Sequence, residues 1–496
     1  MLTALVFTPL VGALVILFMN KEKEQQIRRT ALAFSLIPLL IVLLMAFQFE
    51  PGAGMQFVER YEWIPSIGVS YYLGTDGISF PMLVVTALVT PLAILASFSI
   101  THRVKEFFAL FLLLETGMLG VFVALDYFLF YIFWEVVLVP MYFLIGIWGG
   151  PRRQYASIKF FIYTLAGSVV MLVGILALYF ASGLGTFDML AIAEHGRLGR
   201  FDPTFQVWVF LALFFGFAVK VPIFPFHTWL PDAHVEAPTG GSMVLAGVLL
   251  KMGTYGFFRI AVPTLPEAAA QFAFPMALLG VIAIVYGALA AMAQPDLKKM
   301  VAYSSISHMG YVVLGIAAGV AGGSTMAMNG ALFVMVSHGI ISPLMFFLAG
   351  TMVYERTHTR MIPEMGGLWS QVPVVGTVLA FAAFANLGLP GLSGFAGEFF
   401  TFVGSFPVYT TLVIVGALGL ILTAGYHLWM MQRVLLGEPK GSPGGMVDIT
   451  GRELVVSVPL MALTLALGIF PPLLLDLVNP SVVALINQVQ LALGGF

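Results

Sequence analysis

Long apolar segments separated by short polar breaks make up most of the chain. Each segment has about the length that an α-helix needs to cross a bilayer, roughly 20 residues. Reading from break to break predicts fourteen membrane-spanning helices, and the first of them is expected to be a retained span because charged residues follow rather than precede it. They are expected at about residues 2–20, 30–48, 76–100, 107–124, 126–149, 157–182, 205–233, 239–262, 271–293, 299–320, 325–352, 372–403, 408–435 and 453–476.

The composition supports a membrane protein. Hydrophobic residues make up 60% of the chain and charged residues 9%, whereas a soluble domain carries about a quarter charged residues. The chain has no cysteine, which excludes disulfides and thiolate ligands for iron–sulfur clusters or zinc. Its net charge of -2 argues against nucleic-acid binding. The fold class that follows is an all-α polytopic membrane protein.

The basic residues sort sharply between the two sets of loops. The loops on the far side carry only three of them, Arg60, Arg197 and Arg200. By the positive-inside rule the richer set is cytoplasmic, so both termini are expected on the extracytoplasmic side of a cell membrane. That set holds 16 of the 22 basic residues: Lys21, Lys23, Arg28, Arg29, Arg103, Lys105, Arg152, Arg153, Lys159, Lys298, Lys299, Arg356, Arg360, Arg433, Lys440 and Arg452.

A few ionisable residues fall inside the predicted spans. A lysine at the centre of a span costs roughly 2.5 to 3.5 kcal/mol, so it persists where it faces a partner or water and has a task there. Burial also moves the pKa of a carboxyl or an ammonium group toward neutrality, which allows proton exchange. The nine candidates are Glu115, Glu135, Lys220, Lys251, Arg259, His308, His338, Glu398 and His427.

Each candidate also has a structural interpretation. Glu135 could form an ion pair that only fixes helix packing, but small residues do that more cheaply in lipid, which favours a function. His308 and His338 could each be a core histidine bonded to neighbouring hydroxyls or a member of a proton relay, and either interpretation fits. Arg259 lies near a helix end and is expected to snorkel to the interface. Glu115 and His427 remain open.

Two histidines and two acids stand close together at residues 226–236. Pro231 is expected to break the helix between them, and they have no metal-ligand spacing, so we expect a solvated turn rather than a metal site. No phosphate loop or dinucleotide motif occurs in the sequence.

Two of the predicted spans are interrupted. The seventh contains Pro222, Pro225 and Pro231, and the twelfth contains Pro390 within a run of glycines at every third position, 388–397. Interrupted helices that cross in opposite directions are typical of inverted repeats. We therefore predict two inverted five-helix repeats, at about 107–262 and 263–435, with three helices before them (1–106) and one helix and a tail after them (436–496).

Four runs make the chain resemble a known family. They are Trp134-Glu135 to Pro140-Met-Tyr, Lys220-Val-Pro-Ile-Phe-Pro-Phe-His to Ala237-Pro-Thr239, Leu249-Leu-Lys251-Met-Gly253 and Ser307-His308-Met-Gly310. These runs are similar to the proton-translocating antiporter-like subunits of respiratory complex I and to subunits of Mrp-type cation/proton antiporters. Glu398 within Gly397-Glu-Phe, where several relatives have lysine, favours the M-type (chain-four) subfamily.

The resemblance implies roles for the buried residues. Glu135 would pair with Lys220, Lys251 would be the central carrier, and His308 and His338 would continue a hydrated line to Glu398. The predicted relay is Glu135, Lys220, Lys251, His308, His338 and Glu398, with Glu115 as a further candidate. The driving energy would come from quinone reduction in other subunits, which would hold the FMN, the iron–sulfur clusters and the quinone, so this chain would bind no cofactor or metal.

The implied partners are protons, the lipid bilayer and other membrane subunits of the complex, including neighbouring antiporter-like subunits, in a bacterial inner membrane. Three rival functions remain: a subunit of an Mrp-type Na⁺/H⁺ antiporter, a subunit of a membrane-bound hydrogenase or formate hydrogenlyase, and a structural scaffold. The scaffold predicts that Lys220 and Lys251 can both be replaced without loss of function, which their cost argues against.

Overall fold

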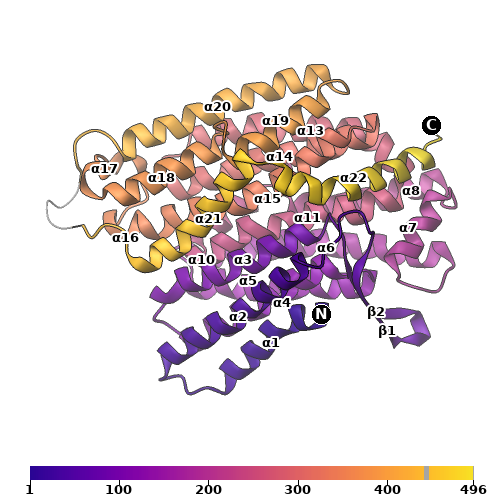
Figure 1. Ribbon diagram of the computed structural model, residues 1–496, viewed down its shortest axis with the longest axis horizontal. Coiled ribbons are helices and arrows are strands. Elements are labelled where there is room, and N and C mark those ends of the chain that lie inside the picture. The colour runs from indigo at the N-terminus through magenta and orange to yellow at the C-terminus, as the bar shows by residue number, and fades with distance from the viewer. Residues whose placement is uncertain (441–445, 495–496) are drawn as a thin grey trace.

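The fold is a bundle of membrane-length helices packed side by side. The computed structural model describes residues 1–440 and 446–494. Most helices run along the long axis of the molecule, and the chain progresses from the N-terminal helices on one side of the bundle to the helix around residue 420 on the other, before its C-terminal helices return across the middle (Figure 1). Thirteen helices in the described residues are long and apolar enough to cross a membrane, and the apolar helices Leu2–Phe18 and Pro373–Asn386 are shorter. The predicted fold class is confirmed.

Helices cover all fourteen predicted segments. Ten of the segments form helices close to the predicted bounds. Seven of these are α1 (Leu2–Phe18), α2 (Glu24–Ala46), α3 (Phe80–Ala96), α4 (Val104–Val123), α5 (Tyr127–Trp148), α6 (Arg153–Ser182) and α13 (Pro266–Met292). The other three are α14 (Leu297–Gly322), α15 (Thr325–Phe347, continuing through the π-turn η5, Leu348–Met352, into α16, Tyr354–Thr357) and α20 (Thr410–Val434). The short 3-10 turns are η1 (Pro65–Ile67), η2 (Ser97–Ser99) and η6 (Ile362–Glu364), and α17 (Leu368–Gln371) is a single turn.

Both predicted interruptions are present. The seventh span divides into α8 (Pro203–Lys220) and α9 (Trp229–Glu236), and the twelfth into α18 (Pro373–Asn386) and α19 (Ser393–Ser405). Gly388 and Gly391 in the second break have φ values of 80° and 91°, a conformation that glycine adopts without strain. Pro231 does not break α9, since it lies in the first turn, where the backbone needs no N–H donor.

The eighth span is irregular in a way that the sequence did not reveal. It runs through α10 (Thr239–Val244), the π-turn η3 (Leu245–Leu249), α11 (Leu250–Gly256), the π-turn η4 (Phe257–Ala261) and α12 (Val262–Thr264). Lys251 follows the first π-turn and Arg259 lies in the second. Such π-turns are frequent at functional sites.

One end of the bundle carries a small β-hairpin, which was not predicted. Strands β1 (Gln56–Ile64) and β2 (Val69–Thr75) pair antiparallel, with Arg60 opposite Tyr72. The amphipathic helix α7 (Met189–Arg197) lies at the same end, which we call the hairpin end. The Met1 amino group contacts Glu59 of β1, so the N-terminus also lies there.

The C-terminal region differs from the prediction of one helix and a tail. It forms α21 (Gly451–Ile469) and α22 (Pro472–Ala492). At its start Glu453 binds Arg356, far from the hairpin, and near its end Gln490 donates to the carbonyl of Val320 at the hairpin end. The two helices together therefore make one passage, and both termini lie at the hairpin end.

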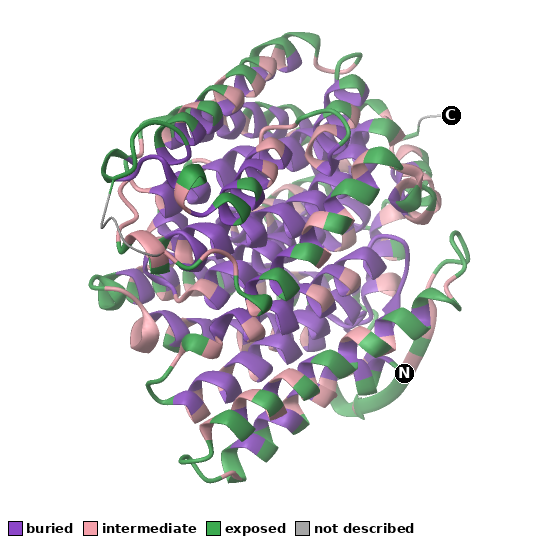
Figure 2. Cartoon of the chain, turned by 60° about the vertical axis from the view of Figure 1, so that its left-hand side comes forward, coloured by how far each residue is buried: buried purple, intermediate pink, exposed green. Residues whose placement is uncertain are grey.

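Buried residues fill the middle of the bundle, and exposed residues cover its outer helices (Figure 2). In the most apolar stretch of the α15 span every residue is buried, and in that of α10 to α12 94% of the residues are buried. In that of α20 only 33% are buried. The eighth and eleventh spans therefore form the centre on which the candidate side chains converge.

Candidate functional site

Lys251 and His338 meet at the centre of the bundle. The Lys251 ammonium lies 2.6 Å from Nδ1 of His338 and 2.5 Å from the carbonyl oxygen of Ala246, which belongs to the π-turn η3. An ammonium group has only donors, so His338 accepts through Nδ1 and its neutral ring carries a proton on Nε2. Lys251 is thus held by two neutral acceptors, with no carboxylate in hydrogen-bonding contact among the described residues.

His308 and Glu398 form the next contact. Nδ1 of His308 lies 3.1 Å from Oε1 of Glu398, and both side chains are buried. The rings of His308 and His338 stand with their centroids 5.4 Å apart. Two direct contacts and one ring-to-ring step therefore join Lys251, His338, His308 and Glu398, side chains from α11, α15, α14 and α19.

A small cavity lies against this line of side chains. Its volume is about 10 Å³, and its lining includes His308, His338 and Glu398. Each of these residues has one side-chain atom without a hydrogen-bond partner in the described chain: Nε2 of both histidines and Oε2 of Glu398. A space of this size is close to the minimum for one water molecule, and its polar atoms suit one.

Lys220 and Glu135 do not touch. The Lys220 ammonium stands over the rings of Trp134 and Phe160, 5.3 and 6.0 Å from their centroids. No ion pair within 4.0 Å joins it to Glu135 in the described part of the chain, although Glu135 is the charged residue whose field acts on it. Oε1 of Glu135 is buried without a partner. The pairing of Lys220 with Glu135 therefore stays a prediction.

The surroundings of Glu115 and of His427 differ in how far they satisfy each side chain. Glu115 on α4 is fully buried, and neither carboxyl oxygen has a partner among the described residues. His427 donates through Nδ1 to the carbonyl of Thr423 at 2.9 Å and accepts from the Asn386 amide through Nε2 at 3.0 Å. Both of its ring nitrogens are satisfied, which favours the structural interpretation.

The expectation that Arg259 snorkels to the interface is wrong. Its guanidinium lies 2.5 Å from Oδ1 of Asp76, and only 9% of each side chain is exposed. Its Nε also donates to the hydroxyl of Tyr255 at 3.1 Å. A buried carboxylate in the loop before α3 draws Arg259 inward, and the sequence alone did not indicate that loop.

The expected solvated turn at 226–236 is also buried. His234 is fully buried, and His227 and Glu236 are nearly so. His234 stacks on Phe346 with ring centroids 4.2 Å apart, and neither ring nitrogen has a partner among the described residues. The short helix α9 packs against α6 and α14, which removes its polar side chains from solvent.

Sequence reasoning missed several other buried polar residues. Asn386 ends α18 and donates to both His427 and Ser304. Lys298 was assigned to a loop but is buried in the first turn of α14, where it donates to the Ala237 carbonyl at 2.6 Å. The proximity of Asn386 to the second break was a usable signal, whereas nothing in the sequence distinguishes Lys298 from its half-buried neighbour Lys299.

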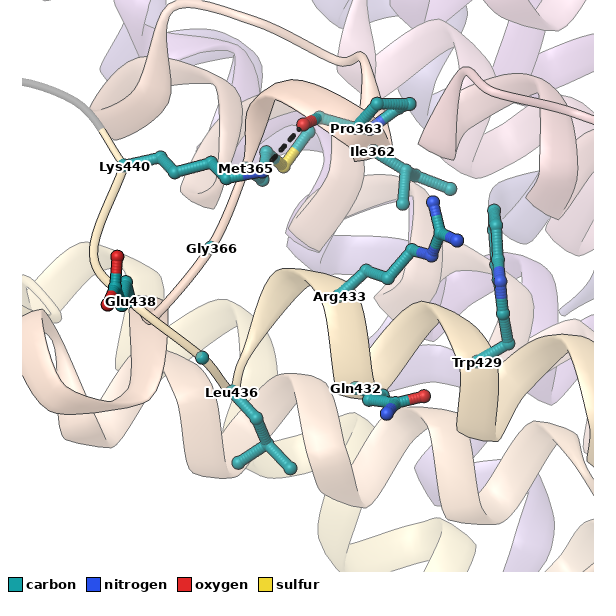
Figure 3. Close-up of a pocket in the computed structure, with 11 residues that line it drawn as sticks. Ile362, Pro363, Met365, Gly366, Trp429, Gln432, Arg433, Leu436, Glu438 and Lys440 are labelled. Atoms are coloured by element: carbon teal, nitrogen blue, oxygen red, sulfur yellow. Dashed lines mark hydrogen bonds between the residues drawn. The ribbon is translucent and has the colours of Figure 1, made fainter.

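A surface cavity lies away from the buried line of Lys251, His338, His308 and Glu398. It has a volume of about 550 Å³ at the end of α20, beside residues 362–366. Figure 3 shows Arg433 and Trp429 directed into it, and the Arg433 guanidinium stands 4.4 Å from the indole ring. Its position at the bundle end separates this cavity from the buried side chains at the centre.

No cluster of three or more possible metal ligands occurs within residues 1–440 and 446–494. The two histidines and two acids of the α9 segment are thus not gathered around one point.

Family comparisons cover most of the chain. A family described as NADH:quinone oxidoreductase/Mrp antiporter, TM matches residues 124–423. A second family, NADH-ubiquinone oxidoreductase chain 4, amino terminus, matches residues 1–124. The two matched regions adjoin at residue 124, directly before α5.

Similar proteins extend over the full length. NADH-quinone oxidoreductase subunit M of Rhodobacter capsulatus is 44% identical, over 100% of this chain and 98% of that protein. NAD(P)H-quinone oxidoreductase chain 4 1 of Synechococcus elongatus is 43% identical, over 99% of this chain and 92% of that protein.

Solved structures agree. A chain of respiratory complex I from Thermus thermophilus has a TM-score of 0.89 and 31% identity, covering 99% of this chain and 100% of that one. A chain of the Mrp complex from Dietzia has a TM-score of 0.85 and 22% identity, covering 99% of each chain, which shows a shared fold.

Proposed function

Because the chain belongs to the NADH:quinone oxidoreductase/Mrp antiporter family, and within it to subunit M, we propose that it is a proton-translocating membrane subunit of an NADH:quinone oxidoreductase. Its full-length similarity to subunit M supports complex I over an Mrp antiporter, to which the likeness is one of fold. The oxidation of NADH and the reduction of quinone take place in other subunits, and FMN, iron–sulfur clusters and quinone bind there.

The observation that carries the proposal is the line from Lys251 through His338 and His308 to Glu398. All four side chains are buried in the middle of the bundle. A neutral imidazole accepts a proton at one nitrogen and releases one at the other, which makes histidine a suitable link between a lysine and a carboxylate. The contact of 2.6 Å from Lys251 to His338 and that of 3.1 Å from His308 to Glu398 supply the two ends.

The step between the two histidines uses the cavity beside them. His338 presents an N–H at Nε2, and His308, which donates to Glu398 through Nδ1, presents a lone pair at Nε2. One water molecule in the cavity would accept from the first ring and donate to the second. The proton then reaches Glu398, whose free Oε2 lies against Gly388 in the break between α18 and α19.

Lys220 and Glu135 act as the switch that feeds this line. When the side chains approach, the carboxylate stabilises the protonated lysine, and when they separate the lysine loses proton affinity. The structure supports a separated arrangement because the ammonium stands over aromatic rings rather than on the carboxylate. A charge that arrives from a neighbouring antiporter-like subunit would drive the change.

The orientation follows from the basic residues. They gather in loops at the end opposite the hairpin, so that end faces the cytoplasm and the hairpin end, with both termini, faces the extracytoplasmic side of a bacterial inner membrane. The long exposed apolar faces of α6 and α20 contact lipid or other membrane subunits of the complex.

Reconstituted complex I with Lys220→Met tests the proposal. Removal of a positioned acid–base group is expected to slow proton transfer by about 10²-fold or more, so that pumping per NADH oxidised falls while the complex stays assembled. Glu135→Gln is expected to act in the same direction, and Lys23→Met, which removes an exposed lysine, should change nothing. Full pumping in an assembled Lys220→Met complex would contradict the proposed function.

A further inference from the structure

The ion pair between Arg259 and Asp76 is buried, with only 9% of each side chain exposed. Oδ1 of Asp76 accepts from Arg259 and from the backbone N–H groups of Ile78 and Ser79, at 3.0 and 3.1 Å. The next residue, Gly77, donates to the Ser481 hydroxyl of α22. The pair therefore joins the eighth span to the loop before α3, and that loop to the C-terminal passage.

A large polar cavity ends at this pair. Its volume is about 520 Å³, and it lies between the hairpin, α7, η4 and α22. Its lining carries charges of both signs: Arg60, Asp76, Asp188, Glu194, Arg197 and Arg259. Arg60 is 51% exposed where it binds Asp188, whereas Arg259 is 9% exposed. The cavity thus leads from the surface at the hairpin end to Arg259.

Lys251 lies on the other side of the pair. The hydroxyl of Tyr255 accepts from Arg259 and donates to the carbonyl of Phe122 at 3.2 Å. Lys251 precedes Tyr255 by four residues on α11, which is about 6 Å along a helix axis. Tyr255 therefore lies between Arg259 and Lys251 along this span.

The chemistry of these groups opposes proton passage. A guanidinium stays protonated in proteins, so Arg259 can neither take up nor release a proton. Asp76 stays ionised: burial acts to raise its pKa, but Arg259 and the two backbone N–H groups hold that pKa below its usual value. Neither member of the pair therefore exchanges protons readily near neutral pH.

We propose that the Arg259–Asp76 ion pair is a seal that keeps protons in the hairpin-end cavity from reaching Lys251. This inference rests on the proposed function, since a seal is needed only where Lys251 carries protons. The cavity is open to water, and the pair prevents return flow through it down the proton gradient. Protons leave the buried line by another route, through Glu398 on the far side of His308.

The test measures passive proton entry into vesicles that contain the reconstituted complex without NADH. Arg259→Ala is expected to raise the proton conductance well above that of the wild type, and Arg259→Lys, which keeps the charge, to restore a low conductance. Arg60→Ala is the matched control, because it breaks an ion pair that lines the same cavity and Arg60 is 51% exposed. A purely structural ion pair would lower stability without raising conductance.

An assembled Arg259→Ala complex with wild-type conductance would overturn the seal. If that variant does not assemble, Arg259→Gln with Asp76→Asn decides, because it keeps a polar contact and removes both charges, and it too must leak. Proton pumping by a Lys251→Met complex, measured in such vesicles after NADH is added, distinguishes the two proposals. Normal pumping there contradicts the proposed function, whereas loss of pumping together with tight Arg259 variants contradicts the seal alone.

Discussion

The two central lysines solve the cost of a buried charge in different ways. Lys251 is bound by a carbonyl and an imidazole, both neutral acceptors. The Lys220 ammonium instead stands over the rings of Trp134 and Phe160, in the field of Glu135. The Lys251 ammonium, hydrogen-bonded to a titratable ring, is positioned for proton transfer. The Lys220 ammonium makes no such directional contact with the rings beneath it.

His338 and His427 give a contrast at the level of single residues. His338→Phe removes the acceptor of Lys251 and is expected to slow coupled proton transfer by about 10²-fold. His427→Phe removes the hydrogen bonds that its ring makes with the Thr423 carbonyl and the Asn386 amide, each worth about 0.5–1.5 kcal/mol. It should therefore lower the thermal stability of the complex and leave pumping per NADH unchanged.

Proton pumping and the midpoint of thermal inactivation, measured on both variants, check this contrast. Equal loss of pumping in the two would show that His427 also carries protons.

The cost of burying charge explains which residues the sequence revealed. Lys220, Lys251, His308, His338 and Glu398 stand in long apolar runs, so their burial could be predicted. Which of them touch could not be predicted from spacing, because Lys251 and His338 are 87 positions apart and meet through packing of α11 on α15. Arg259 was misplaced because its partner lies in a loop on another part of the chain.

At the scale of elements, the breaks in the seventh and twelfth spans bring ionisable groups and irregular backbone together. Proline and glycine made both breaks predictable. The π-turns beside Lys251 and Arg259 were not, since they depend on packing rather than on any residue that disfavours an α-helix. Whether the halves 107–262 and 263–435 are inverted repeats remains a prediction.

Gly388 tests the importance of the second break. Its φ of 80° would cost an alanine about 1–2 kcal/mol, and the added Cβ would lie 2.8 Å from Oε2 of Glu398. Gly388→Ala is therefore expected to displace the Glu398 carboxylate and reduce pumping. Gly425→Ala is the control, because it lies in regular helix with ordinary contact distances. Equal pumping in the two variants would show that the conformation of this break is unimportant.

Asp448 makes the junction between α18 and α21 sensitive to pH. Its carboxylate accepts from the N–H groups of Val374 and Val375 in the first turn of α18. Slight burial acts to raise its pKa, but these donors and that of Ile449 hold the pKa below the usual value. Because the folded-state pKa is lowered, the stabilisation is present above the usual aspartate pKa and is lost as pH falls through the folded-state value.

Asp448→Ala should remove this dependence and cost about 1 kcal/mol at neutral pH, as loss of a helix-capping side chain does. Thermal inactivation of wild type and variant measured from neutral to acidic pH checks it. The two curves should converge in acid, and a constant difference at all pH values would show that the carboxylate charge plays no part.

At the scale of the molecule, apolar length alone predicted the bundle of helices, whereas the orientation predicted from the basic residues stays a prediction. Two features lay beyond that pattern. The hairpin strand β1 carries the charged residues Glu59, Arg60 and Glu62 among aromatic ones, so its sequence carries little hydrophobic signal. Helix α22 follows two prolines and contains Asp476 and Pro480, which resembled a tail, yet α21 and α22 together make a single passage and keep the termini at one end.

The bundle places a line of buried ionisable side chains at its centre and, at one end, a cavity lined by the Arg259–Asp76 ion pair. We propose that protons cross the subunit through Lys251. The most direct measurement is the number of protons pumped per NADH oxidised by reconstituted complex I carrying Lys251→Met, with Lys23→Met as the control. We predict an assembled complex with wild-type content of FMN and iron–sulfur clusters and a reduced ratio for Lys251→Met alone. An unchanged ratio in that variant would contradict the account.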